Sequence, residues 1–65
     1  KEIGELVSIY EKMKPKDAAR IFDQLDMDVL LDVLQRMKAS KTAPVLAAMD
    51  SNRAQEITVR IAERR

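Results

Sequence analysis

The sequence contains no cysteine and no histidine, and its only aromatic residues are Tyr10 and Phe22. Without histidine or cysteine, a general base active near neutral pH would have to be a strongly perturbed lysine, aspartate or glutamate. The sequence also lacks the motifs of nucleophilic serines, phosphate-binding glycine loops and zinc sites. We therefore expect a chain that is not an enzyme and that needs no cofactor. With no cysteine, the redox compartment cannot be inferred.

Glycine and proline are scarce too, with one glycine and two prolines among 65 residues. Hydrophobic residues make up 46% of the chain and charged residues 35%. This balance excludes a disordered chain or a β-sandwich and is typical of short helices joined by tight turns. The length allows one domain at most, with a modest core. Because the chain begins with lysine, we expect it to be a fragment of a longer protein.

No charge of one sign dominates, since the net charge is +1 and no basic block is present. Nucleic-acid binding requires a cationic stripe or aromatic stacking platforms, and the sequence predicts neither. No hydrophobic run approaches the length that crosses a membrane. The sequence therefore predicts neither a nucleic-acid partner nor membrane insertion by this segment.

What the chain does have is a twelve-residue repeat of large apolar residues. The repeat anchors are Met13, Leu25, Met37, Met49 and Ile61. Apolar or small residues recur four, three and seven positions before the later anchors, as in Val33, Leu34 and Leu30 before Met37. These offsets trace one face of an α-helix. One short amphipathic helix per repeat cannot bury its own stripe, so the helices must stack on one another.

The repeat and its helix-capping residues predict an all-α fold of about five short helices. We expect them over residues 2–13, from Pro15 to about residue 25, after Asp26, after Ser40 to near Met49, and over 51–63. The expected inner face of the second helix is Ala18, Ile21, Phe22 and Leu25, and the third should be the most buried. Residues 1–13 form an N-terminal helix outside the repeat, and residues 14–65 form the helical-repeat domain.

The first helix carries a candidate surface for self-association. Ile3, Leu6, Tyr10 and Met13 alternate in steps of three and four, the spacing of a coiled-coil seam. Two hypotheses remain open. The helix is the end of an upstream coiled coil that makes the parent protein a homodimer, or it caps the repeat array.

Three further apolar residues, Met27, Leu31 and Val59, lie off the repeated stripe. We expect them to contact the first helix, a second chain or a partner protein.

Four acidic residues close together in the sequence are candidates for a hard-cation site: Asp23, Asp26, Asp28 and Asp32. Magnesium and calcium require several oxygen ligands that converge on one point. Asp26 and Asp28 are explained as the cap and first turn of a helix, and the other two flank them. We therefore predict capping residues on a solvated face and no metal site.

Two segments carry a resemblance to a known family. Residues 13–22 (MKPKDAARIF) and 25–31 (LDMDVLL) resemble the helical repeat of the MgtE N-terminal domain superfamily, to which repeats of the flagellar switch protein FliG are related. This resemblance implies a compact superhelical array of short helices. It also implies one hypothesis for function, namely that the chain is a magnesium-sensing regulatory domain of an MgtE-type transporter.

A closer resemblance is to the C-terminal domain of the MotE family of flagellar motility proteins. It is carried by residues 14–19 (KPKDAA), 41–46 (KTAPVL) and 49–54 (MDSNRA). It implies a periplasmic chaperone or scaffold for the stator-associated protein MotC, which self-associates through a segment before this domain. Our main expectation is thus a protein–protein interaction domain of the flagellar motor. The transporter hypothesis, with a cytoplasmic location, and a generic helical capping module are the alternatives.

One departure weighs against the transporter hypothesis. Four lysines, Lys14, Lys16, Lys38 and Lys41, occupy repeat starts where that family's magnesium-binding domain would carry acids. No metal ligand can be transferred from the family to this sequence.

Overall fold

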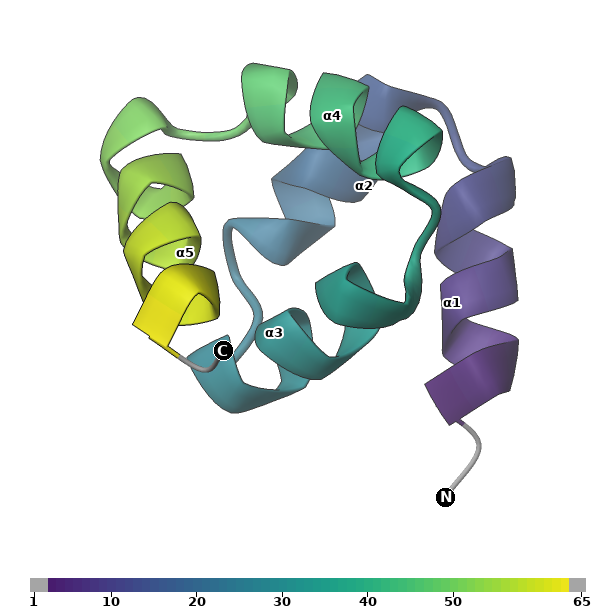
Figure 1. Ribbon diagram of the computed structural model, residues 1–65. Coiled ribbons are helices and arrows are strands. Elements are labelled where there is room, and N and C mark those ends of the chain that lie inside the picture. Colours follow the sequence, from purple (N-terminus) through teal and green to yellow (C-terminus); the bar gives the residue numbers. More distant parts are fainter. Residues whose placement is uncertain (1–2, 64–65) are drawn as a thin grey trace.

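A computed structural model describes residues 3–63 of the chain, which form five α-helices (Figure 1). They are α1 (Ile3–Lys12), α2 (Pro15–Phe22), α3 (Met27–Arg36), α4 (Ala39–Ala48) and α5 (Ser51–Glu63). No strand occurs within this range. The predicted all-α array of five short helices is therefore confirmed. The predicted start of the first helix, at residue 2, lies outside the described residues.

Three of the predicted helix starts are correct. Pro15 is the first residue of α2, where its missing N–H costs no hydrogen bond. Asp26 precedes α3, although its side chain makes no capping hydrogen bond. Asp50 precedes α5 and caps it in the usual way, because its Oδ2 accepts a hydrogen bond from the N–H of Arg53 at 3.1 Å.

The prediction that Ser40 caps the fourth helix is wrong. Helix α4 begins at Ala39, its N-cap is Lys38, and Ser40 lies inside its first turn. The acceptor that Ser40 was expected to supply comes from another helix, since Glu11 Oε2 accepts a hydrogen bond from the N–H of Lys38 at 2.8 Å. Pro44 is inside α4 and leaves the Ser40 carbonyl without its helical donor. Both residues are exposed, so water can solvate that carbonyl.

This capping between helices is repeated one unit further along the chain. Asp23 lies twelve residues after Glu11, and its Oδ1 accepts a hydrogen bond at 3.2 Å from the N–H of Asp50, twelve residues after Lys38. In both cases a carboxylate at the end of one helix holds the start of the helix three places later. The sequence repeat is thus also a repeat of tertiary contacts.

The helices pack in an alternating order, in which each contacts the helix two places along. Helix α1 packs on α3, α3 on α5, and α2 on α4, with a further contact between α4 and α5. In Figure 1, α1 and α5 lie at opposite sides of the molecule, with α3 and α4 between them. Short turns force this arrangement, because successive helices must cross at large angles.

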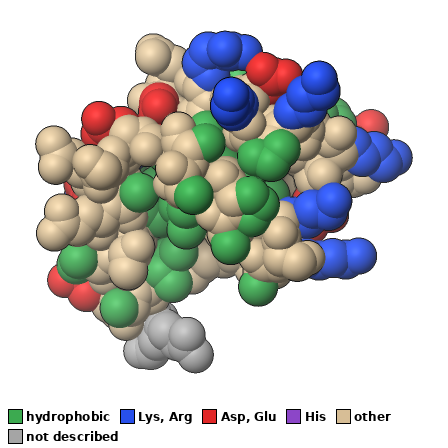
Figure 2. Space-filling view, turned by 90° about the horizontal axis from the view of Figure 1, so that it is seen from above, with side chains coloured by type: hydrophobic (Ala, Val, Ile, Leu, Met, Phe, Trp, Pro, Cys, Tyr) green, Lys and Arg blue, Asp and Glu red, His purple; other side chains and the backbone are tan. Residues whose placement is uncertain are grey.

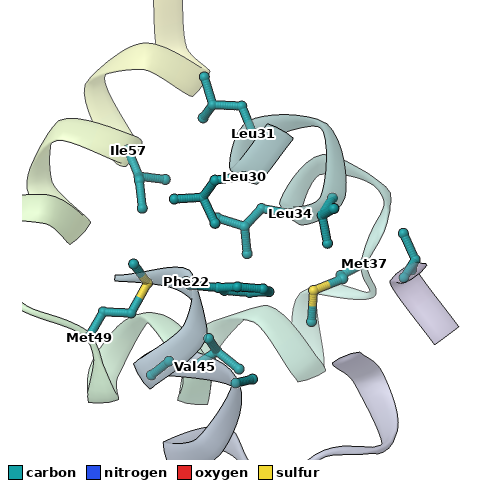
Figure 3. Close-up of a cluster of buried hydrophobic side chains, with 12 residues drawn as sticks. Phe22, Leu30, Leu31, Leu34, Met37, Val45, Met49 and Ile57 are labelled. Carbon is teal, nitrogen blue, oxygen red and sulfur yellow. The ribbon is translucent and has the colours of Figure 1, made fainter. Parts of the chain in front are cut away.

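The core fills the space enclosed by these helices, with Phe22 at its centre (Figure 3). Phe22, Leu30, Val33 and Ile57 are fully buried. Tyr10 of α1 packs edge-on against Phe22, with ring centroids 4.9 Å apart. Of the described helices, α3 contributes the most buried residues, as predicted: Leu30, Leu31, Val33 and Leu34.

The predicted inner face of α2 is partly wrong. Ile21 is 38% exposed, whereas Ala19, which was not assigned to the core, is buried together with Ala18 and Phe22. Two short side chains in sequence let the neighbouring helix α4 approach the backbone of α2 closely. The buried face of α2 therefore centres on the two alanines rather than on the β-branched position of the repeat.

Candidate interaction surface

The seven residues predicted for partner contact or self-association have different surroundings. Four of them, Ile3, Tyr10, Met13 and Met27, are partly buried against the core. Leu6 and Val59 are exposed by 37% and 50%. The residue of α1 that enters the core is Val7, at 8% exposure. Tyr10 and Ile3 thus lie on the core side of α1, and Leu6 lies on a side that solvent reaches.

Leu31 is not available to a partner protein. It is only 3% exposed and belongs to the core. In Figure 3 its side chain extends from α3 towards α5. Leu31 is therefore buried by packing within the chain. The sequence periodicity did not predict the burial of Leu31, because it predicts one buried apolar face for each helix. Helix α3 packs against both α1 and α5 and is therefore buried on more than one side.

An open, largely apolar groove of about 460 Å³ lies between α3, α4 and α5. We call it the α4 groove, and its lining residues are Leu34, Gln35, Met37, Ala39, Thr42, Ala43, Leu46 and Ile61. Thr42 Oγ1 is buried in this wall and has no hydrogen-bond partner. This groove could not be predicted from the sequence, because its lining residues come from α3, α4 and α5 and lie together only once these helices are packed.

Five exposed lysines surround the point where α1 ends and α2 and α4 begin. This lysine patch consists of Lys12, Lys14, Lys16, Lys38 and Lys41. Lys14 and Lys38 are the N-cap residues of α2 and α4. The hydrogen bond from the Lys38 N–H to Glu11 brings these two junctions together. Figure 2 shows Lys and Arg side chains gathered along one side of this face, beside a group of hydrophobic side chains.

The lysine patch carries a positive potential that its own carboxylates only partly offset. Glu11 is next to the patch, and Asp17 in the first turn of α2 pairs with Arg20 through a 2.5 Å contact. The positive ends of the α2 and α4 dipoles add to the charge of the lysines. The sequence shows no basic block because these lysines come from two separate turns, α1–α2 and α3–α4. Only the packing of α2 on α4 unites them.

The acidic residues near the α2–α3 turn do not make a cation site. Asp23 is occupied by its hydrogen bond to Asp50, and Asp28 lies in the first turn of α3, where it complements the helix dipole. Across residues 3–63, no three carboxylate, histidine or cysteine side chains come together in a way that could hold a metal ion. The donor set therefore does not fit magnesium, and no ligand is assigned.

Arg53 is a structural residue that sequence reasoning missed. From α5, its Nη2 donates to the carbonyl oxygens of Leu25 and of Phe22, the latter at 3.2 Å, and its Nε is 3.4 Å from the Phe22 oxygen. This guanidinium thus satisfies carbonyls at the end of α2. Its position in the first turn of α5 did not indicate this role, because its acceptors lie about 30 residues earlier in the chain.

None of the helices described, over residues 3–63, has the length and hydrophobicity needed to cross a membrane.

Comparison with known proteins gives one result. Neither the curated proteins nor the solved structures contain a significant match to this chain. The sequence model of one family, the MgtE intracellular N domain, matches residues 3–60. The matched range begins at the first residue of α1 and includes α1 to α4 and most of α5. The chain belongs to the family of the MgtE intracellular N domain.

Proposed function

We propose that this chain is a non-catalytic regulatory domain of the MgtE type that acts by docking on another protein surface. The family match supports the regulatory assignment. The observation that supports docking is the lysine patch, five exposed cations assembled from two turns beside an apolar groove. Such a surface complements an acidic protein surface and accelerates encounter with it.

The proposed partner surface is acidic, and its contact with the patch can be tested chemically. A zero-length carbodiimide couples lysine amines to carboxylates that lie in contact with them. We expect cross-links from Lys14 or Lys38 to acidic residues of the docked protein. The charge-reversing pair Lys14→Glu and Lys38→Glu should abolish docking.

Two controls make that experiment specific. The pair Lys14→Arg and Lys38→Arg keeps the charge but removes the amines, so docking should persist while these cross-links vanish. Charge reversal at Arg60 on α5, a surface residue paired with Glu56, should leave docking unchanged. Cross-links spread evenly over all lysines, or docking that survives Lys14→Glu with Lys38→Glu, would refute the assignment. The identity of the cross-linked peptide then separates a transporter domain from a flagellar protein.

Magnesium sensing is a second candidate function, favoured by the family to which the chain belongs. It requires an acidic site, whereas the repeat starts here carry lysines and Asp23 is held by a backbone N–H. We therefore expect millimolar magnesium to leave the thermal melting temperature unchanged at matched ionic strength. A saturable rise that disappears in Asp28→Asn or Asp32→Asn would establish sensing instead.

The flagellar hypothesis rests on the resemblance of residues 14–19, 41–46 and 49–54 to MotE. Under it, the domain is periplasmic, homodimerises through an upstream segment and assists MotC. Titration of the labelled chain with purified MotC, followed by amide chemical shifts, tests this directly. Shifts confined to the lysine patch and the α4 groove support the hypothesis, and an unchanged spectrum at saturating MotC refutes it.

A further inference from the structure

The α4 groove occupies a defined place in the repeat. Its lining residues on α4 can be compared with the positions two repeats, or 24 residues, earlier. Ala39, Thr42, Ala43 and Leu46 correspond in this way to Pro15, Ala18, Ala19 and Phe22. Three of these four earlier residues are almost completely buried, and they lie on α2, the helix on which α4 packs. The groove is therefore the α4 copy of the surface that α2 uses to hold a helix.

The position of Glu11 also has a counterpart in this register. Glu11 accepts the hydrogen bond from the N–H of Lys38, the N-cap residue of α4, and the residue 24 positions after Glu11 is Gln35, which lines the α4 groove. The groove thus repeats the register of the α2 surface and has a largely apolar lining, which an amphipathic helix can contact.

Helix α1 presents the complementary surface. It is the one described helix that exposes two large apolar residues a turn apart, Leu6 at 37% and Ile9 at 49%. Leu6, Ile9 and Tyr10 have the i, i+3, i+4 spacing of an amphipathic helix, and Tyr10 is partly buried against the core of its own chain. Ile21, Val29 and Val59, by contrast, are single exposed residues on their helices.

The charges at the rim of the α4 groove favour helix α1 as its occupant. Lys38 and Lys41 are exposed and adjoin the lining residues Met37, Ala39 and Thr42, so the rim is positive. The exposed Glu5 lies beside Leu6 on α1, so the candidate helix brings a negative charge next to its apolar strip. Opposite charges at the rim favour this pairing and fix its register.

We propose that the α4 groove is a docking site for helix α1 of a second copy of this chain. Leu6 and Ile9 of that copy enter the groove, and its Glu5 faces Lys38 and Lys41. The proposal shares Lys38 and Lys41 with the lysine patch, but it concerns association between copies and is measured without any partner. It also gives the two exposed apolar residues of α1 a role that packing within one chain leaves open.

The test uses sedimentation velocity of the purified chain over a wide concentration range. Ile9→Asp places a charge in the apolar strip, and Ala43→Glu places one in the groove. Each variant should weaken self-association at least about tenfold, as expected for a residue central to an interface. Circular dichroism checks that each remains helical, and Leu6→Gln is the milder second variant if Ile9→Asp unfolds. Val59→Asp, equally exposed on α5, is the matched control and should associate as the wild type does.

Mixing the two defective variants makes the test decisive. The Ile9→Asp chain still has an intact groove, and the Ala43→Glu chain still has an intact α1. An equimolar mixture should therefore form a one-to-one complex although neither variant associates alone, and added salt should weaken that complex. A monomeric wild type at the highest concentrations, or a mixture that stays monomeric, would overturn the proposal. Such a result would leave the lysine-patch experiment unaffected.

Discussion

Replacement of Arg53 by methionine tests how far one side chain holds the helical array together. Arg53 crosses from α5 to the end of α2 and donates hydrogen bonds to the carbonyl oxygens of Phe22 and Leu25. Hydrogen bonds to a charged group contribute about 1.5–3 kcal/mol net. Arg53→Met keeps much of the aliphatic stem but leaves these carbonyls to water. We expect the free energy of unfolding to fall by about 2 kcal/mol, a large fraction for a domain of this size.

The assay is urea unfolding followed by circular dichroism at the helical band, with the midpoint and slope fitted for each variant. Arg60→Met is the matched control on the same helix. Its salt bridge to Glu56 spans 3.1 Å between side chains that are about half exposed, so its loss should cost only about 0.3–0.5 kcal/mol. Arg53→Lys keeps the charge but loses the planar fork, so its stability should lie between those of the wild type and Arg53→Met.

Equal effects of Arg53→Met and Arg60→Met would refute this reasoning. That result would mean that water replaces the guanidinium at the end of α2 without cost, and that apolar packing alone positions α5. A fall much larger than 3 kcal/mol would also be inconsistent, because it exceeds what hydrogen bonds at a partly buried site supply. It would point to a loss of core packing around Phe22 instead.

Three other predictions concern stability and use the same urea assay. Leu34→Ala removes a core side chain that is 3% exposed and should cost about 2–5 kcal/mol, and a loss below about 1 kcal/mol would contradict the core assignment. Glu11→Ala and Asp23→Ala each remove a carboxylate that accepts a hydrogen bond at the start of a later helix, and each should lower the free energy of unfolding by about 1 kcal/mol. An unchanged urea midpoint for both variants would show that these two caps are dispensable. Thr42→Val removes a buried hydroxyl that has no hydrogen-bond partner, so stability should stay equal or rise by up to about 1 kcal/mol, whereas a clear loss would reveal a partner for Thr42.

Much of the local structure was predictable because it depends on neighbours in sequence. Pro15 and Asp50 begin helices wherever an amphipathic stripe follows them. Leu34 and Ile57 are buried because helical periodicity places them on the stripe that must be covered. The predicted stripe failed at Ile21, where the pair Ala18 and Ala19 sets how closely another helix can approach.

The candidate surfaces were predictable only in part, because each is assembled from separate segments. Leu6 was recognised as a contact candidate from its spacing on one helix and is exposed in the structure. The lysine patch was not recognised, since Lys14 and Lys38 lie in different turns, and the packing of α2 on α4 brings these turns together. Leu31 was predicted as a contact residue because it lies off the repeated stripe. Its side chain is buried because it extends from α3 towards α5, and the position of α5 cannot be read from the local sequence pattern.

The sequence by itself determined the helical class, the number of helices, most of their boundaries and most of the core. These follow from local propensity, capping and a twelve-residue period, which act over a few residues. The start of α4 at Ala39, the Arg53 bridge, the α4 groove and the lysine patch were decided by tertiary structure alone. Each joins groups that lie far apart in the sequence, and no local pattern records how close two helices come once both are packed.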